Sequence, residues 1–380
     1  MDINNEYYKK IIYKKNIEKD LKEIFLKNYR YKKILCVYSS SARQDFGVKI
    51  GNAMSLAGCA FNVVSYSSAG MKKEEIYDDL LLLKYKNFDL IVCVGGGTIC
   101  DASKMISNVF GCELILVTAT PSNFSYFTDF ALGFNGEIVF CDRVKNILID
   151  EECLSKASED LFKNGMLFLK SLFVAIEEID VNKEIFKEEL RDCPITKSRL
   201  FEMIEEIDHT SDHGERNLLL MDAFIEIGYC FNGISKNYLS VVMLAEILRL
   251  NSPAKTCFGE LAYVGAVSLH NCYEKFFSLK TIKMFLTEEN IIKNNLNING
   301  QKHVKNDKYS IFYRNNLFFN KINAIKNNLL KNILEENTCL QDKFSGLGLT
   351  AKDCVGGIKI LANDYDCGLL VDLIHNCGVI

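Results

Sequence analysis

The chain has only three prolines and five histidines among its 380 residues. It has no apolar segment of the roughly 18 residues that a membrane-spanning helix needs. Its N-terminus is polar and lacks the hydrophobic stretch and the small-residue cleavage site of an export signal. These absences predict a cytoplasmic protein with no membrane span. Because none of the prolines marks a linker, a domain boundary has to be sought in a change of pattern.

The chain also lacks an excess of positive charge and any CxxC pair. Its 45 Lys and Arg residues are outnumbered by 49 Asp and Glu residues, which gives a formal net charge of −4 at pH 7. This balance argues against nucleic acid as a partner. The 15 cysteines are odd in number and lie scattered through apolar runs, so we expect buried thiols. A small-molecule substrate is the expected partner. A homo-oligomer is compatible with the sequence, which does not fix the oligomeric state.

Helical and strand-like segments alternate over the first 150 residues. Short apolar runs predict strands, and amphipathic stretches between them predict helices. The predicted strands are 33–38, 60–65, 89–94 and 113–117, and the predicted helices are 45–56, 76–85 and 101–109. This alternation predicts an α/β fold with a parallel sheet. Ligands of such sheets bind beyond the carboxyl ends of the strands.

The pattern changes near residue 150. The helical periodicities beyond it are long, and almost no strand signal accompanies them. They cover residues 154–179, 195–207, 217–228 and 238–250. We therefore predict an α/β domain over residues 1–150 and an all-α domain over residues 151–380.

Three consecutive glycines follow the third of the predicted strands. The apolar run 90–94 leads directly into Gly95, Gly96 and Gly97, and a helical pattern begins at about Thr98. Glycines have no Cβ, so backbone N–H groups in such a turn can approach an anion closely, and the helix that follows contributes its positive end. The turn is therefore predicted to bind phosphate. The alternative is that the glycines only form a tight corner between a strand and a helix.

An acidic and a basic residue follow the glycine turn on the same predicted helix. Asp101 and Lys104 are three residues apart, so both side chains are expected to face the mouth of the turn. Asp101 lies near the start of the helix, where a carboxylate complements the helix dipole.

The sequence Gly-Gly-Gly-Thr-Ile-Cys-Asp-Ala-Ser-Lys at 95–104 resembles the GGGxxxDxxK dinucleotide-binding element of one superfamily. This superfamily contains iron-containing alcohol dehydrogenases, glycerol dehydrogenases and glycerol-1-phosphate dehydrogenases, together with dehydroquinate synthase. Residues 117–123, Val-Thr-Ala-Thr-Pro-Ser-Asn, are similar to the VPTxxSND segment that follows in the family, and residues 362–373 are similar to its closing helices. The resemblance implies a Rossmann-like domain followed by a helical domain with the metal and substrate site.

The resemblance also implies a cofactor and a reaction. The cofactor would be NAD or NADP, and the reaction would be hydride transfer between its nicotinamide and an alcohol carbon whose oxygen is held by a divalent metal. Gly95, Gly96 and Gly97 would cradle the pyrophosphate. The other cofactor-binding residues implied are Thr98, Asp101, Thr118 and Ser122.

The metal ligands of the family are only partly present. The family uses an aspartate and two histidines, and Asp160 matches the aspartate, although an aspartate near a helix start can also serve as a cap. Asn237 and Phe258 occupy the two histidine positions. An amide oxygen replaces imidazole poorly at zinc or iron, and a phenyl ring cannot bind a metal. Phe124 likewise stands where the family has an acidic residue. The changes at Asn237 and Phe258 argue against a bound zinc, iron or nickel ion, whereas the position of Phe124 is one that commonly contacts the substrate in the glycerol dehydrogenases.

Three functions remain open. The first is an NAD(P)-dependent oxidoreductase that acts on a small polyol, a polyol phosphate or an alcohol, with Asp160 and Lys104 as catalytic residues. The second is a catalytically degenerate member that binds nucleotide and has a binding or regulatory role. The third is a metal-free enzyme in which Lys104 or Tyr126 polarises the substrate oxygen.

Overall fold

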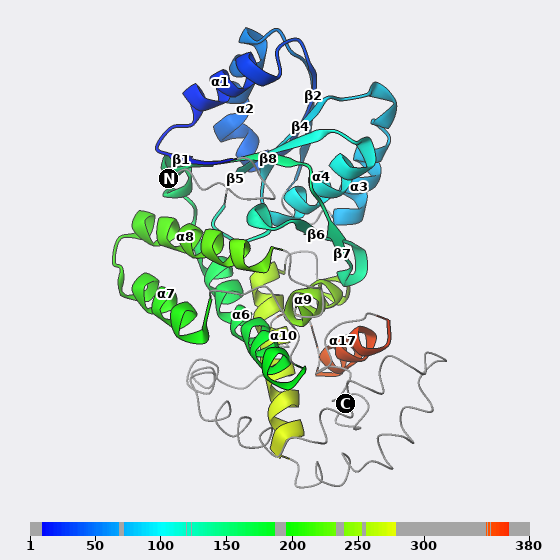
Figure 1. Cartoon of the computed structure of the whole chain (residues 1–380), viewed down its shortest axis with the longest axis vertical. Helices are drawn as coiled ribbons and strands as arrows, with labels where there is room; N and C mark the ends of the chain where they lie inside the picture. The colour runs from blue at the N-terminus through cyan, green and yellow to red at the C-terminus, as the bar shows by residue number, and fades with distance from the viewer. Residues whose placement is uncertain are drawn as a thin grey trace. The chain divides into compact units, whose positions relative to one another are not determined.

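The computed structural model divides the chain into two compact units. The first contains residues 1–169, 194–233 and 253–260, and the second contains residues 170–193, 234–252 and 261–380. The described residues are 10–67, 72–118, 120–122, 124–186, 195–232, 239–252, 256–278, 347, 349 and 351–364. Figure 1 shows their helices and strands.

A six-stranded sheet forms the centre of the first unit, and every neighbouring pair of its strands is parallel. Its order is β1-β8-β5-β4-β2-β3. The strands are β1 (Lys10–Lys14), β2 (Lys33–Ser39), β3 (Ala60–Tyr66), β4 (Leu90–Gly95), β5 (Glu113–Thr118) and β8 (Val144–Asp150). The α/β fold and the four predicted strands are confirmed. Strands β1 and β8 were not predicted, nor was the antiparallel hairpin of β6 (Phe130–Leu132) and β7 (Ile138–Phe140).

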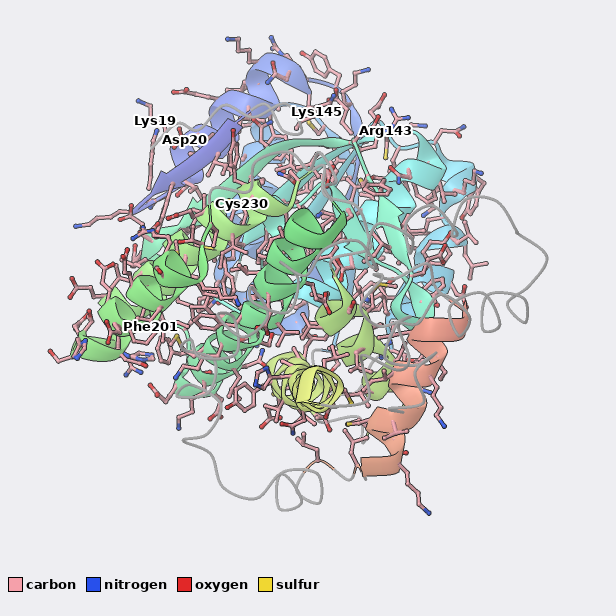
Figure 2. All side chains as sticks on the ribbon, turned by 60° about the horizontal axis from the view of Figure 1, so that its bottom comes forward. Lys19, Asp20, Arg143, Lys145, Phe201 and Cys230 are labelled. Atoms are coloured by element: carbon pink, nitrogen blue, oxygen red, sulfur yellow. The ribbon has the colours of Figure 1, made fainter. Side chains whose placement is uncertain are left out.

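Helices α1 (Glu18–Asn28) and α2 (Ser40–Leu56) cover one face of this sheet (Figure 1). Their buried side chains form one apolar cluster with alternate residues of the strands, such as Ile34, Val92 and Val117. Lys14 Nζ, at the end of β1, lies 2.7 Å from Oδ1 of Asp20 on α1, a residue that Figure 2 labels. Helices α3 (Lys73–Leu81) and α4 (Gly97–Phe110) pack against each other, and α4 also contacts β4 and β5.

The register of the sheet brings three chain segments to one edge. Tyr38 of β2 pairs with Val94 of β4, and Gly95 pairs with Thr118 of β5. All these strands run in the same direction, so their carboxyl ends meet there. The start of α2, the glycine turn and the segment after Thr118 are therefore neighbours.

The rest of the described chain is largely helical, as predicted. The helices are α5 (Glu151–Leu154), α6 (Glu159–Phe186), α7 (Lys197–His209), α8 (His213–Phe231), α9 (Ser240–Asn251), α10 (Phe258–Ser278) and α17 (Ala351–Asp364). Three short 3₁₀ turns are η1 (Lys84–Lys86), η2 (Ser125–Phe127) and η3 (Phe134–Gly136). None of the described helices is long and apolar enough to cross a membrane.

The division into units does not coincide with a boundary at residue 150. The first unit extends through the first part of α6 and includes α7 and α8. The reason is close packing on the segment that follows β5. A Cβ on Gly165 of α6 would lie 2.2 Å from the carbonyl oxygen of Pro121, and one on Gly228 of α8 would lie 2.5 Å from the Cβ of Phe127. Two glycines thus let helices beyond residue 150 complete the core of the sheet unit.

Candidate functional site

The glycine turn lies where β4 ends and α4 begins. Gly95 is buried, Gly96 is the N-cap of α4, and Gly97 is its first residue. Gly96 and Gly97 are half-buried and Thr98 is exposed, so the start of the helix reaches the surface. The first N–H groups of a helix have no partner within it, and they point outward from this turn. The predicted turn between strand and helix is present.

A second helix start lies beside the turn, and the sequence reading missed it. A Cβ on Gly95 would lie 3.2 Å from the backbone nitrogen of Ser39. Ser39 is the N-cap of α2, and its Oγ accepts a hydrogen bond from Ala42 N at 3.3 Å. Two helix N-termini therefore meet at this edge, and both carry positive partial charge. The signal in the sequence was the triplet Ser39, Ser40 and Ser41 directly after a predicted strand.

Hydroxyl groups from the segment after β5 form a chain beside the turn. The Oγ1 of Thr120 lies 2.8 Å from Oγ of Ser122 and 3.3 Å from the hydroxyl oxygen of Tyr126. The Tyr126 hydroxyl in turn donates to the carbonyl oxygen of Gly95 at 2.7 Å. Burial raises the pKa of Tyr126 well above its usual value, so the phenol stays protonated and acts as a donor. Ser122 was predicted to lie here, whereas Thr120 was missed.

Thr118 ends β5 opposite Gly95 and is 1% exposed. Within the described part of the chain, its hydroxyl oxygen has no hydrogen-bond partner. A buried hydroxyl without a partner costs free energy. Thr118 thus places an unused hydrogen-bonding group at the end of the strand next to the glycine turn.

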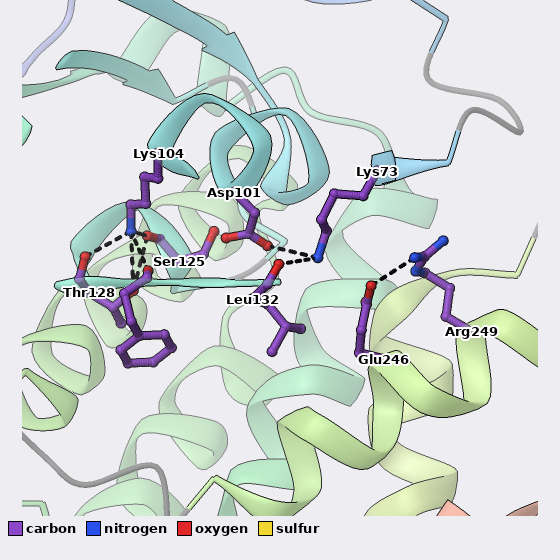
Figure 3. Close-up of polar contacts among 9 residues, drawn as sticks. Lys73, Asp101, Lys104, Ser125, Thr128, Leu132, Glu246 and Arg249 are labelled. Atoms are coloured by element: carbon purple, nitrogen blue, oxygen red, sulfur yellow. Dashed lines mark hydrogen bonds and ion pairs between the residues drawn. The ribbon is translucent and has the colours of Figure 1, made fainter. Parts of the chain in front are cut away.

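The side chains of Asp101 and Lys104 are buried, which differs from the expected exposure at the mouth of the turn. Lys104 is 0% exposed, and its Nζ donates to the carbonyl oxygens of Ser125, Thr128 and Phe130 (Figure 3). Asp101 Oδ2 lies 3.5 Å from Nζ of Lys73. Amphipathic spacing correctly placed both residues on one helix. It could not show that carbonyls of a later segment would surround the ammonium group.

Asp160 and Phe258 both lie near Asn164. Asp160 is exposed in the first turn of α6, and Asn164 follows one turn later. Asn164 Oδ1 accepts a hydrogen bond from Gly259 N at 2.7 Å, next to Phe258 at the start of α10. A Cβ on Gly259 would lie 1.9 Å from the Asn164 carbonyl oxygen, so only glycine allows this approach. Asn237 lies outside the described residues.

The described residues around Asp160 do not fit a divalent metal. The described residues contain no group of three or more His, Cys, Asp or Glu side chains suited to hold one. The Asn164 amide oxygen is already an acceptor for backbone, and Phe258 offers no donor atom. His213 Nδ1 lies 3.1 Å from Glu159 Oε2, and its Nε2 lies 2.6 Å from the carbonyl oxygen of Ala157. The Nε2 atom of this nearby histidine thus faces a backbone carbonyl, and its Nδ1 faces a carboxylate.

An aromatic cluster contains Phe124 and Phe258, two of the three positions where the sequence departs from the family pattern. The rings of Phe124 and Phe168 are stacked with centroids 5.3 Å apart, and Phe168 meets Phe258 edge-on at 5.5 Å. Phe231 lies 5.5 Å from Phe124, and Phe224 lies 5.9 Å from Phe168. Such pairs stabilise a core beyond the area that they bury. Phe124 and Phe258 are therefore parts of one packed arrangement.

The purified protein is expected to contain well below one equivalent of zinc, iron or nickel per chain. Neither Asn164 nor Phe258 supplies a free ligand atom beside Asp160. Elemental analysis of protein purified without chelator measures this directly. One tightly held metal ion per chain would contradict the assignment of these positions.

The comparisons with known proteins agree with this geometry. Residues 12–131 match the family model described as iron-containing alcohol dehydrogenase. The chain is 25% identical to a 3-dehydroquinate synthase of Clostridium botulinum (strain Alaska E43 / Type E3) over 281 residues, which are 66% of this chain and 78% of that protein. The predicted resemblance to the superfamily is thus confirmed.

Two solved structures share the fold over nearly the full length. An archaeal alcohol dehydrogenase from a Red Sea brine pool is 15% identical, with 97% of this chain and 96% of that chain covered at a TM-score of 0.59. The NADH-dependent butanol dehydrogenase A of Thermotoga maritima is 12% identical, with 98% and 96% covered at a TM-score of 0.58.

Proposed function

Because the chain shares the fold and the glycine turn of the iron-containing alcohol dehydrogenase superfamily, we propose that it binds NAD or NADP at this turn. The observation that carries the proposal is the place where β4 meets α4. There the N–H groups of a helix start, a bare glycine backbone and a chain of hydroxyls lie together at the carboxyl edge of a parallel sheet. Edges of this kind bind nucleotides.

Residues of the turn and of the neighbouring segments contribute different groups to the proposed binding. The backbone at Gly96 and Gly97 offers N–H groups to a phosphate, and the positive end of α4 favours its charge. Ser122 and Thr98 supply hydroxyls at the same edge. Thr118 adds a buried hydroxyl whose hydrogen-bonding capacity is unused within the described residues. The start of α2 at Ser39 gives a second region of positive partial charge beside the turn, which favours an anionic ligand there.

The reaction that we propose is hydride transfer between the nicotinamide and a small alcohol, polyol or polyol phosphate. The bound nicotinamide would supply the hydride chemistry. The carboxylate of Asp160 is exposed at the start of α6, and we propose it as a contact for a substrate hydroxyl. No step is assigned to a metal, because the residues beside Asp160 do not fit one. Lys104 has its N–H groups directed to backbone carbonyls, which favours a role in positioning over a catalytic role.

One observation favours a second function, that of a nucleotide-binding protein without catalysis. Phe124 and Phe258, which replace polar residues of the family pattern, both pack on Phe168. Metal stabilisation of an alkoxide is worth several kcal/mol, so its loss lowers the rate by orders of magnitude unless another group replaces it. A chain of this kind would retain the nucleotide site and serve as a binding or regulatory subunit.

Titration calorimetry with NAD, NADH, NADP and NADPH tests the shared part of both functions. At least one nucleotide is expected to bind with a Kd between about 1 μM and 1 mM, the usual range of Michaelis constants for such ligands. The absence of binding heat with all four nucleotides would contradict both proposals. If a nucleotide binds, formation of reduced cofactor with glycerol, glycerol 1-phosphate or butanol supports the oxidoreductase. The absence of turnover with every alcohol supports the second function.

A further inference from the structure

Residues 125–132 are held by lysines that the proposed nucleotide site leaves unexplained. This stretch contains η2, with Tyr126 of the hydroxyl chain, and β6, the first strand of the β6–β7 hairpin. Lys104, on α4, donates from Nζ to the carbonyl oxygens of Thr128 and Phe130, both at 2.8 Å, and to that of Ser125. Thr128 Oγ1 lies 3.3 Å from the same nitrogen. A single ammonium group thus binds three carbonyl oxygens of this stretch.

A second buried lysine holds the far end of the same stretch. Lys73 of α3 is 2% exposed, and its Nζ donates to the carbonyl oxygen of Leu132. The Asp101 carboxylate on α4 lies 3.5 Å from this Nζ (Figure 3). Asp101 and Lys104 of the glycine motif therefore act on one segment, Lys104 directly and Asp101 through Lys73.

Asn232, at the end of α8, holds the middle of the stretch. Its Oδ1 accepts a hydrogen bond from Asp129 N at 2.6 Å, and its Nδ2 donates to the carbonyl oxygen of Phe127 at 2.9 Å. Buried polar groups are costly unless each is hydrogen-bonded. Removing one lysine would therefore leave several buried carbonyls without a donor and loosen the stretch as a whole.

The held segment reaches the glycine turn through one residue. Tyr126 lies within the stretch, is 1% exposed, and donates its hydroxyl hydrogen to the Gly95 carbonyl oxygen at 2.7 Å. Its hydroxyl oxygen also lies 3.3 Å from Oγ1 of Thr120. The position of Tyr126 thus sets both the backbone of the turn and the hydroxyl chain beside it.

We propose that Asp101 and Lys104 are positioning residues that clamp residues 125–132, so that Tyr126 fixes the glycine turn in its nucleotide-binding form. The effect on nucleotide affinity rests on the proposed function. The clamp itself does not, because its contacts lie wholly within the protein. Asp101 and Lys104 of the GGGxxxDxxK motif would thus fix the phosphate site through contacts inside the protein, without touching the ligand.

Hydrogen exchange measured by mass spectrometry tests the clamp without any nucleotide. In Lys104→Met, peptides covering residues 124–132 are expected to exchange about tenfold faster than in the wild type, while peptides of β2 keep their rate. Lys49→Met is the matched control. It removes a lysine whose Nζ lies 3.3 Å from the buried Asp150 carboxylate, away from the clamp. Equal exchange of residues 124–132 in both variants would overturn the clamp. Should Lys104→Met fail to fold, Lys73→Met replaces it with the same expected result.

A double-mutant cycle on nucleotide affinity tests the link through Tyr126. Tyr126→Phe and Lys104→Met are each expected to raise the Kd about fivefold or more, the value of one hydrogen bond. The Kd of the double variant should lie within about twofold of the higher of the two single-variant Kd values, because both changes release the same contact. Losses that multiply would show that Lys104 and Tyr126 act on the ligand independently, and would overturn the proposal. If the wild type binds no nucleotide, the proposed function fails, whereas the exchange experiment still decides the clamp.

Discussion

Replacing Gly165 with alanine is expected to lower the free energy of unfolding by about 3 kcal/mol, the upper part of the usual range for overpacking. The new Cβ would lie 2.2 Å from the Pro121 carbonyl oxygen and 2.8 Å from Cδ2 of Leu220. Backbone cannot move aside as a side-chain end can, so α6 or the segment after β5 must shift. Because Ser122 follows Pro121 directly, nucleotide affinity should also fall.

Denaturant unfolding of Gly165→Ala beside Gly51→Ala measures this effect. Gly51 lies inside α2, and a Cβ there would meet nothing within 4 Å. Alanine at that position should stabilise the protein by about 0.5–1 kcal/mol through its higher helix propensity. A Gly165→Ala variant as stable as Gly51→Ala would show that α6 does not pack on residue 121 as described.

Replacing Gly96 with valine is expected to weaken nucleotide binding at least about 30-fold, equivalent to about 2 kcal/mol, with little change in stability. Gly96 has φ −83° and ψ −176°, an extended conformation that any residue adopts. Its Cβ would lie 3.7 Å from Thr120 Oγ1, which is ordinary contact. The fold should therefore accept valine, while the side chain covers the N–H groups that a phosphate would approach.

Gly96→Ala gives a graded comparison for this variant. A single methyl group covers less of the helix start than an isopropyl group does, so the loss of affinity should be smaller. Nucleotide fluorescence titration and thermal unfolding should be measured on both variants. A loss of affinity that follows a loss of stability, or no loss in either variant, would argue against phosphate binding at this turn.

The sequence was sufficient to predict the glycine turn and four strands of the sheet, because these features are local. An apolar run, bare glycines and a helical period lie within about twenty residues at 90–109. Strand β1 escaped prediction because it has only five residues and a lysine at each end. Its place beside β8 depends on pairing across more than a hundred residues.

The packing of the candidate site could not be predicted, because it depends on contacts between distant segments. The burial of Lys104 follows from carbonyls more than twenty residues further along the chain, and no periodicity reports them. The same holds for the hydrogen bond between Asn164 of α6 and Gly259 at the start of α10. It also holds for the hydrogen bonds of Asn232 to the backbone of residues 127 and 129. Thr120 was within reach of sequence reasoning, since it lies between Thr118 and Ser122 in the segment already singled out.

The relation between the two phenylalanines that replace polar residues of the family pattern is visible only in the structure. In the sequence alone, Phe124 and Phe258 are two unrelated replacements of polar residues. Their rings both contact Phe168, so both belong to one apolar cluster. A histidine restored at position 258 would face this apolar cluster, so that reversion alone should not recreate a metal site.

We propose that a nicotinamide dinucleotide binds at the turn between β4 and α4. Hydrogen exchange of the full chain, with and without saturating NADH or NADPH, tests it most directly. Bound nucleotide should slow exchange at residues 95–100 and 120–126 and leave exchange in α7 unchanged. Slowed exchange confined to other segments, or none with either nucleotide, would contradict it.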